Sequence, residues 1–106
     1  MKDKPLALIT GATSGIGAEF ARRLAKDGYN LIITGRRETK IKALADELSD
    51  SYGSDVEVIL VELSDSAQVD DLIENIKDRD IHLLVNNAGF GTTKFSPTYL
   101  LIYMKR

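Results

Sequence analysis

Cysteine and tryptophan are absent from this 106-residue chain, which has one histidine and two prolines. Without cysteine the chain cannot form disulfides or thiolate metal sites, and one histidine does not supply the ligands of a usual zinc site. Long apolar runs are lacking too: the run within MKDKPLALIT ends at Gly11, too short for a secretion signal or a membrane span. We therefore expect a cytoplasmic protein without a structural metal.

An excess of charge of either sign is also missing. Fourteen basic and sixteen acidic residues leave a net charge of −2, which gives no broad attraction to nucleic acid or to an anionic membrane. The contents of hydrophobic residues, 43%, and of charged residues, 28%, are ordinary for a globular protein, and the length suits one core. Bulk charge therefore predicts neither nucleic acid nor a membrane as a partner.

Short apolar runs alternate with amphipathic patterns along the chain. The runs predict buried strands at residues 6–10, 30–34, 56–61 and 81–85. Apolar residues at helical spacing predict helices within residues 16–27, 41–48 and 69–76, the last capped by Ser64 or Ser66. Strands that alternate with helices form right-handed βαβ units. The predicted fold class is therefore α/β, a doubly wound, Rossmann-like parallel sheet with strand order 3-2-1-4.

A glycine-rich loop, TGATSGIG at residues 10–17, separates the first strand from the first helix. Gly11 permits a tight turn, Gly15 lets backbone amides approach a pyrophosphate, and Gly17 allows the helix to pack close to the strand. The spacing is G-x-x-x-G-x-G without a following Lys-Ser/Thr, which weakens a nucleoside triphosphatase interpretation. The alternative is a glycine-rich turn without a ligand. The remaining candidates in the loop are Thr13, Ser14 and Ile16.

A second motif, Asn86-Asn87-Ala88-Gly89, follows the fourth strand about seventy residues later. With this motif in register, the chain resembles the short-chain dehydrogenase/reductase family from about Pro5 to Gly91. The resemblance implies a dinucleotide-binding domain at residues 1–91, with an atypical tail at 92–106. It also implies that the loop glycines hold the cofactor pyrophosphate, and that the adenine-ribose side is lined by Asn87, Ala88 and Gly89. Alone, the asparagine pair would suit ordinary turn chemistry.

The end of the second strand favours NADP(H) over NAD(H). Relatives that use NAD usually carry an acidic residue there to bind the ribose 2′-hydroxyl, whereas this chain has Arg36 and Arg37 after Gly35. A guanidinium binds phosphate in a bidentate way, so Arg36 is the expected 2′-phosphate ligand, with Arg37, Ser14 and Thr13 as lesser candidates. The alternative is a pair of solvated charges at the start of a helix.

The segment after the third strand offers candidates for the adenine contact. Relatives commonly have an aspartate here, and the matching residue in this chain is Glu62. Leu63 and Asp65 are the alternatives, and Asp65 could instead serve the first turn of the next helix.

The residues that perform hydride transfer in this family cannot be located. Relatives use a serine, a tyrosine, a lysine four residues after that tyrosine, and an asparagine. None of the four tyrosines has a lysine at that spacing. A phenol without a fixed cation nearby is a poor base at neutral pH. We therefore expect a catalytically incomplete NADP(H)-binding module; the alternatives are an oxidoreductase completed by a partner chain and an interaction domain that keeps only the fold.

Residues 92–106 depart from the pattern of the family, and their composition suits a short strand or a brief helix. Such an ending suggests premature termination or a shifted reading frame. Without further strands, the fourth strand would have an open edge and one face of the sheet would be uncovered. Exposed surface of that kind predicts a homo-oligomer that covers the fourth strand, with residues 99–104 as a possible contact.

Overall fold

The strands and helices alternate as the sequence predicts. A computed structural model of the protein describes residues 4–12, 15–87 and 101–104. Each of the four predicted strands agrees with the structure to within one residue at its ends. The elements are β1 (Leu6–Thr10), α1 (Gly15–Lys26), β2 (Asn30–Gly35), α2 (Glu38–Tyr52), β3 (Val56–Leu60), α3 (Ser66–Ile76), β4 (Ile81–Asn86) and β5 (Leu101–Met104).

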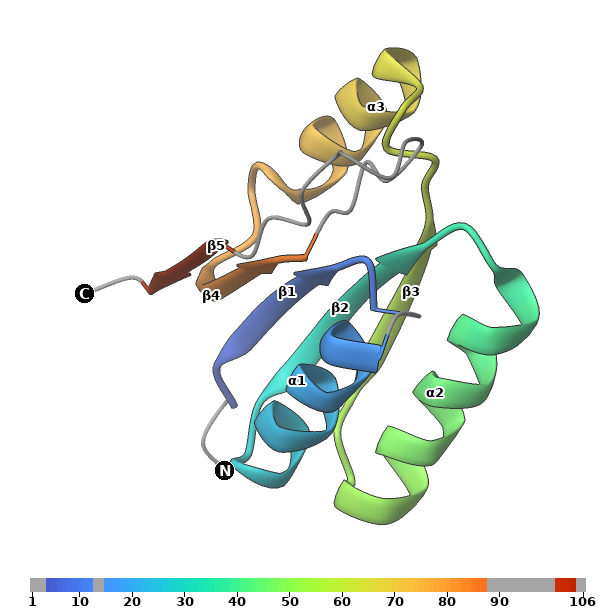
Figure 1. The fold of residues 1–106 in the computed structure, drawn as a ribbon. Helices are drawn as coiled ribbons and strands as arrows, with labels where there is room; N and C mark the ends of the chain where they lie inside the picture. The colour runs from blue at the N-terminus through green and yellow to red at the C-terminus, as the bar shows by residue number, and fades with distance from the viewer. Residues whose placement is uncertain (1–3, 13–14, 88–100, 105–106) are drawn as a thin grey trace.

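These strands form one sheet in the order β3-β2-β1-β4-β5, in which the first four are parallel (Figure 1). The predicted fold class and the predicted order 3-2-1-4 are therefore confirmed. β1 lies at the centre because its residues are apolar on both faces: Ala7, Leu8 and Ile9 are all buried. The chain moves outward from β1 to β3, then returns past β1 to β4, which creates the switch point beside β1.

One face of the sheet carries most of the core. α1 and α2 lie side by side over it (Figure 1), and their buried leucines and isoleucines pack against alternate residues of the strands. The return from β3 to β4 runs the other way along the sheet, so a right-handed crossover places α3 on the opposite face. The core residues from the strands are Ala7, Ile9, Leu31, Ile33, Leu83 and Val85.

The open edge predicted for the fourth strand is wrong. β5 pairs antiparallel with β4, from Leu83 opposite Met104 to Asn86 opposite Leu101. An unpaired strand edge accepts any extended segment, and a segment tethered in the same chain has a high effective concentration. Residues 101–104 therefore cover this edge of β4 within one chain.

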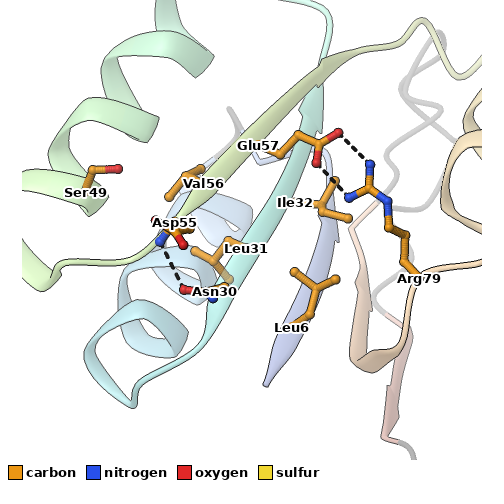
Figure 2. A pocket seen from close by; sticks show the side chains of 9 residues that line it. All are labelled: Leu6, Asn30, Leu31, Ile32, Ser49, Asp55, Val56, Glu57 and Arg79. Carbon is orange, nitrogen blue, oxygen red and sulfur yellow. Dashed lines mark hydrogen bonds and ion pairs between the residues drawn. The ribbon is translucent and has the colours of Figure 1, made fainter. Parts of the chain in front are cut away.

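The prediction of an uncovered face is also wrong at the centre of that face. Leu8 and Ile32, paired between β1 and β2, lie on the face away from α1 and α2, and their exposures are only 3% and 0%. One contribution comes from the ion pair between Glu57 and Arg79, which crosses this face beside Ile32 (Figure 2). Exposed apolar side chains remain at Leu60 and at Ile73.

Candidate cofactor-binding site

The candidate site lies where the carboxyl ends of the parallel strands meet. The loop that leaves β1 and the residues that follow β2, β3 and β4 gather at this edge of the sheet. Ligands of doubly wound sheets bind at this edge, at the switch point. Among the predicted site residues, Thr13, Ser14, Ala88 and Gly89 lie outside the described residues.

Two of the three loop glycines are required by the packing of the protein itself. Gly11 has a φ of +67°, and a Cβ there would lie 2.2 Å from the carbonyl oxygen of Asn87. A Cβ on Gly17 would lie 2.3 Å from the carbonyl oxygen of Gly11 and 2.9 Å from Nδ2 of Asn87. These contacts let the first turn of α1 approach the end of β4 closely.

The packing of the protein does not require a glycine at position 15. Gly15 is exposed, it opens α1, and a Cβ placed on it would meet nothing within 4 Å. The first amides of a helix have no partner within the helix and carry its partial positive charge, so they form a natural anion site. A pyrophosphate therefore fits here, because a glycine leaves open the space through which it would reach these amides. Ile16 is 55% exposed beside it.

Asn87 ties this loop to the end of β4. Its side-chain amide donates to the carbonyl oxygen of Gly11 at 3.3 Å, and its backbone N–H donates to Oγ1 of Thr10 at 3.1 Å. The Thr10 hydroxyl in turn donates to Oδ1 of Asn86 at 2.6 Å. The positioning role of Thr10 was not predicted from the sequence; a threonine that ends a buried strand just before a glycine turn was the available signal.

The next hydrogen bonds join the loop to β2 and then to β3. The backbone N–H of Ala12 donates to the carbonyl oxygen of Thr34 at 3.0 Å, and that of Val61 donates to Gly35 at 2.9 Å. The second bond continues the pairing of β2 and β3 past the end of β3, so the residues that follow, Arg36 and Glu62, lie next to each other.

Arg36 and Glu62 form an ion pair that the sequence analysis missed. Nη1 of Arg36 lies 3.4 Å from Oε2 of Glu62, and the two side chains are 68% and 37% exposed. From the sequence, the two residues have separate predicted roles, Arg36 with the 2′-phosphate and Glu62 with adenine. Arg37 directly precedes α2, and its side chain makes no capping hydrogen bond to the helix. Leu63, the alternative candidate for the adenine contact, is half-buried.

The Glu62 carboxylate is held by its own loop. Its Oε1 accepts from the hydroxyl of Ser64 at 3.0 Å and from the backbone N–H of Ser64 at 3.4 Å. The backbone N–H of Glu62 donates to the side-chain oxygen of Gln68 at 2.8 Å. The bonds from Ser64, followed by the nearby Arg36 guanidinium, lower the pKa of Glu62 from its usual value. Glu62 therefore carries a negative charge at neutral pH.

The predicted caps of α3, Ser64 and Ser66, are wrong. The capping residue is Asp65, whose carboxylate accepts from the backbone N–H groups of Ala67 at 3.0 Å and of Gln68 at 3.4 Å. Asp65 thus serves the first turn of the helix, as its alternative interpretation predicted. Aspartate caps as well as serine does, so the sequence alone could not choose among three neighbouring candidates.

A separate depression lies at the opposite edge of the sheet. Figure 2 shows it near the amino ends of β2 and β3, with the Glu57 carboxylate turned toward the Arg79 guanidinium. Their two hydrogen bonds measure 2.7 and 3.0 Å. Because it opens away from the glycine loop, this depression is not the cofactor site. Its lining consists of Leu6, Asn30, Leu31, Ile32, Ser49, Asp55, Val56, Glu57 and Arg79.

The part of the chain that the structure describes holds neither a metal-binding cluster nor a membrane-spanning helix. Across residues 4–12, 15–87 and 101–104, no three histidine, aspartate or glutamate side chains are grouped so that they could share a metal ion. Within the same ranges, every helix is too short or too polar to span a bilayer.

Comparison with known proteins gives a consistent result. Residues 5–101 match the family described as short chain dehydrogenase. Sulfoacetaldehyde reductase 2 of Chromohalobacter salexigens is 43% identical over 88 residues, which cover 81% of this chain and 34% of that protein. A short-chain dehydrogenase from Sphingobium yanoikuyae, solved in complex with NADPH, superposes with a TM-score of 0.77 at 40% sequence identity. The match covers 80% of this chain and 34% of the Sphingobium chain.

A third similar protein is L-sorbose reductase from Gluconobacter frateurii, solved with NADPH and L-sorbose. Its TM-score is 0.76 at 30% identity, over 87% of this chain and 36% of that chain. The chain spans about a quarter to two fifths of the length of the curated relatives it matches, for example 26% and 38%. The similarity therefore concerns only a part of each of those proteins.

Proposed function

This chain belongs to the short-chain dehydrogenase family, and we propose that it is the NADP(H)-binding portion of an oxidoreductase of that kind. The observation that carries the proposal is the open space at Gly15, where α1 begins, together with the guanidinium of Arg36, which follows β2 at the same edge of the sheet. The first feature suits a pyrophosphate and the second a 2′-phosphate. Relatives of known structure were solved with NADPH, which supports the same choice.

Each part of the site has a distinct task in this proposal. The amides at the start of α1 hold the pyrophosphate, while Asn87 and Thr10 keep the loop in the shape that presents them. Arg36 holds the 2′-phosphate in the position where NAD-dependent relatives have a carboxylate. A bound nicotinamide dinucleotide would supply the hydride chemistry.

The proposal extends to what this chain does alone. The sequence has no Tyr-x-x-x-Lys, so it lacks the pair that moves a proton in complete relatives. We expect the 106-residue chain to bind the cofactor without reducing a ketone, because no tyrosine in its sequence has a lysine four residues after it.

Calorimetric titration of the chain with NADPH and with NADH, followed by an assay of NADPH oxidation with several ketones, tests the proposal. Binding of NADPH without turnover is expected. Turnover would instead favour an oxidoreductase that is completed by a second chain. No heat with either nucleotide would favour an interaction domain that keeps only the fold.

Arg36→Asp separates the two cofactors. The change replaces a phosphate ligand by a carboxylate that repels phosphate and accepts a bond from a 2′-hydroxyl, so preference should move from NADPH toward NADH. Unchanged relative affinities would remove Arg36 from this role.

Self-association is proposed in a modified form. The outer strand beside β4 is β5, so an assembly that extends the sheet would pair two chains through β5 rather than β4. Sedimentation at micromolar concentration tests this, and a monomer would contradict it.

A further inference from the structure

We propose that Glu62 is a specificity-determining residue that weakens the preference for the 2′-phosphate by acting on Arg36. This inference rests on the proposed NADP(H) site. The inference differs from the expected contact with adenine, because it gives Glu62 an electrostatic effect on the binding of the 2′-phosphate. The observation behind it is the 3.4 Å separation between Oε2 of Glu62 and Nη1 of Arg36.

The carboxylate occupies one side of the guanidinium that the phosphate would need. A phosphate is bound most strongly when a guanidinium offers it two parallel N–H donors. In this structure Nη1 of Arg36 already faces Glu62. A phosphate must therefore displace the carboxylate or share the guanidinium with it, and either arrangement costs binding free energy.

Glu62 is also restrained from moving away. Its other oxygen, Oε1, accepts two hydrogen bonds from Ser64, and its backbone N–H is bonded to Gln68. Gln68 is in turn bonded to Asp65, the residue that caps α3. A negative charge is thus fixed beside the place where a second, doubly charged group is expected to bind.

Glu62 would strengthen NADPH binding only if it oriented Arg36 for the phosphate, and that role would require a different geometry. If Glu62 oriented Arg36 for the phosphate, the pair should be short and shielded from solvent. The contact is instead at the long end of the hydrogen-bond range, and the arginine side chain is 68% exposed. An exposed pair of this kind orders its partners weakly. Repulsion and competition therefore outweigh any gain from orientation.

Glu62→Gln is the direct test, because it removes the charge and keeps the shape of the side chain. With the full chain, calorimetry should show the ratio of NADPH affinity to NADH affinity rising about twofold to fivefold, the range expected for exposed charge pairs. The gain should shrink at high salt, because salt screens exposed charges.

Glu38→Gln is the matched control. Glu38 lies two residues after Arg36, is exposed, and pairs with Lys42 at 2.7 Å, so the variant makes the same change in net charge without touching Arg36. It should leave the NADPH affinity unchanged. Equal gains in both variants would reduce the effect to net charge and overturn the proposal.

Ser64→Ala is a second test of the proposed effect of Glu62 on NADPH affinity. The variant removes the shorter of the two hydrogen bonds to Oε1 of Glu62 and so loosens the carboxylate, and a smaller gain in NADPH affinity than that of Glu62→Gln is expected. Loss of NADPH affinity in Glu62→Gln would show that the residue orients Arg36, and an unchanged preference would show no coupling; both contradict the inference. If the unaltered chain binds no NADPH at all, the proposed function itself fails.

Discussion

The side-chain amide of Asn87, at the end of β4, donates a hydrogen bond to the carbonyl oxygen of Gly11, in the loop that leaves β1. Only 4% of Asn87 is exposed, and its carbonyl oxygen would lie 2.2 Å from a Cβ on Gly11. Two motifs that are 76 residues apart in the sequence thus hold each other in shape. The loop geometry depends on β4 as much as on its own glycines.

Asn87→Ala should destabilise the fold by about 1–3 kcal/mol, because it removes a buried hydrogen bond and leaves space around the loop. Urea unfolding followed by circular dichroism measures this. Asn87→Asp keeps the shape but loses the donor, so it should also be destabilising. Full stability of both variants would show that the bond to Gly11 does not support the loop.

Gly15→Ala should separate stability from binding. A Cβ there meets no protein atom within 4 Å, and alanine favours a helix over glycine by up to about 1 kcal/mol. The thermal midpoint should stay level or rise. NADPH affinity should fall about tenfold or more, because the Cβ occupies the approach to the amides of α1, and a tenfold loss needs only about 1.4 kcal/mol.

Gly17→Ala is the matched comparison for that prediction. Its Cβ would lie 2.3 Å from the carbonyl oxygen of Gly11, so this variant should lose about 1–3 kcal/mol of stability. If Gly15→Ala binds NADPH as well as the unaltered chain does, the glycine is not needed for a ligand.

Sequence patterns were sufficient for the fold because the central strands β1 and β2 are apolar on both faces and each helix has an amphipathic stripe. The strands at Leu6–Thr10 and Ile81–Asn86 are also bounded by glycine or asparagine. β5 could not be placed, because four apolar residues in a tail pair equally well within one chain or between chains. Its partner depends on tertiary proximity, which periodicity does not report.

Asp65→Ala should lower stability by about 0.5–2 kcal/mol, the usual effect of losing a side chain that caps a helix. The loss should be concentrated in α3, where hydrogen exchange of the first-turn amides of Ala67 and Gln68 should accelerate. Ser66→Ala is the control, because Ser66 lies inside the helix and does not cap it. A larger loss for Ser66→Ala would contradict the assignment of the cap.

Glu57→Gln should reduce stability at neutral pH by less than about 1 kcal/mol, since its partner Arg79 is joined through a largely exposed ion pair. The hydrogen bonds from Arg79 lower the pKa of Glu57 from its ordinary value of 4.5. A lowered folded-state pKa gives stability that is present above the unfolded value and is lost as the pH falls through the folded one.

The difference between Glu57→Gln and the unaltered chain should therefore be constant from pH 7 to about pH 5 and disappear in more acidic solution. Thermal unfolding across this range provides the measurement. A difference that grows on acidification would have the wrong sign for this ion pair.

The sequence predicts those residues of the candidate site whose type is required by the backbone geometry. It does not predict contacts between two side chains that are far apart in the sequence. Gly11 and Gly17 follow from tight turns and close approach, so their positions in a motif were informative. The contact between Arg36 and Glu62 joins two loops 26 residues apart, and no local pattern encodes that distance. Only the pairing of β2 with β3 brings these residues together.

The most direct test of the central claim is an NADPH titration of the isotope-labelled chain, followed by assigned amide resonances. If the cofactor binds at the carboxyl edge of the sheet, the largest shifts should fall on Gly15, Ile16, Gly17 and Arg36. The amides of Glu57 and Arg79, at the opposite edge, should stay in place. Shifts centred on Glu57 and Arg79, or no shifts with saturating NADPH, would contradict the account.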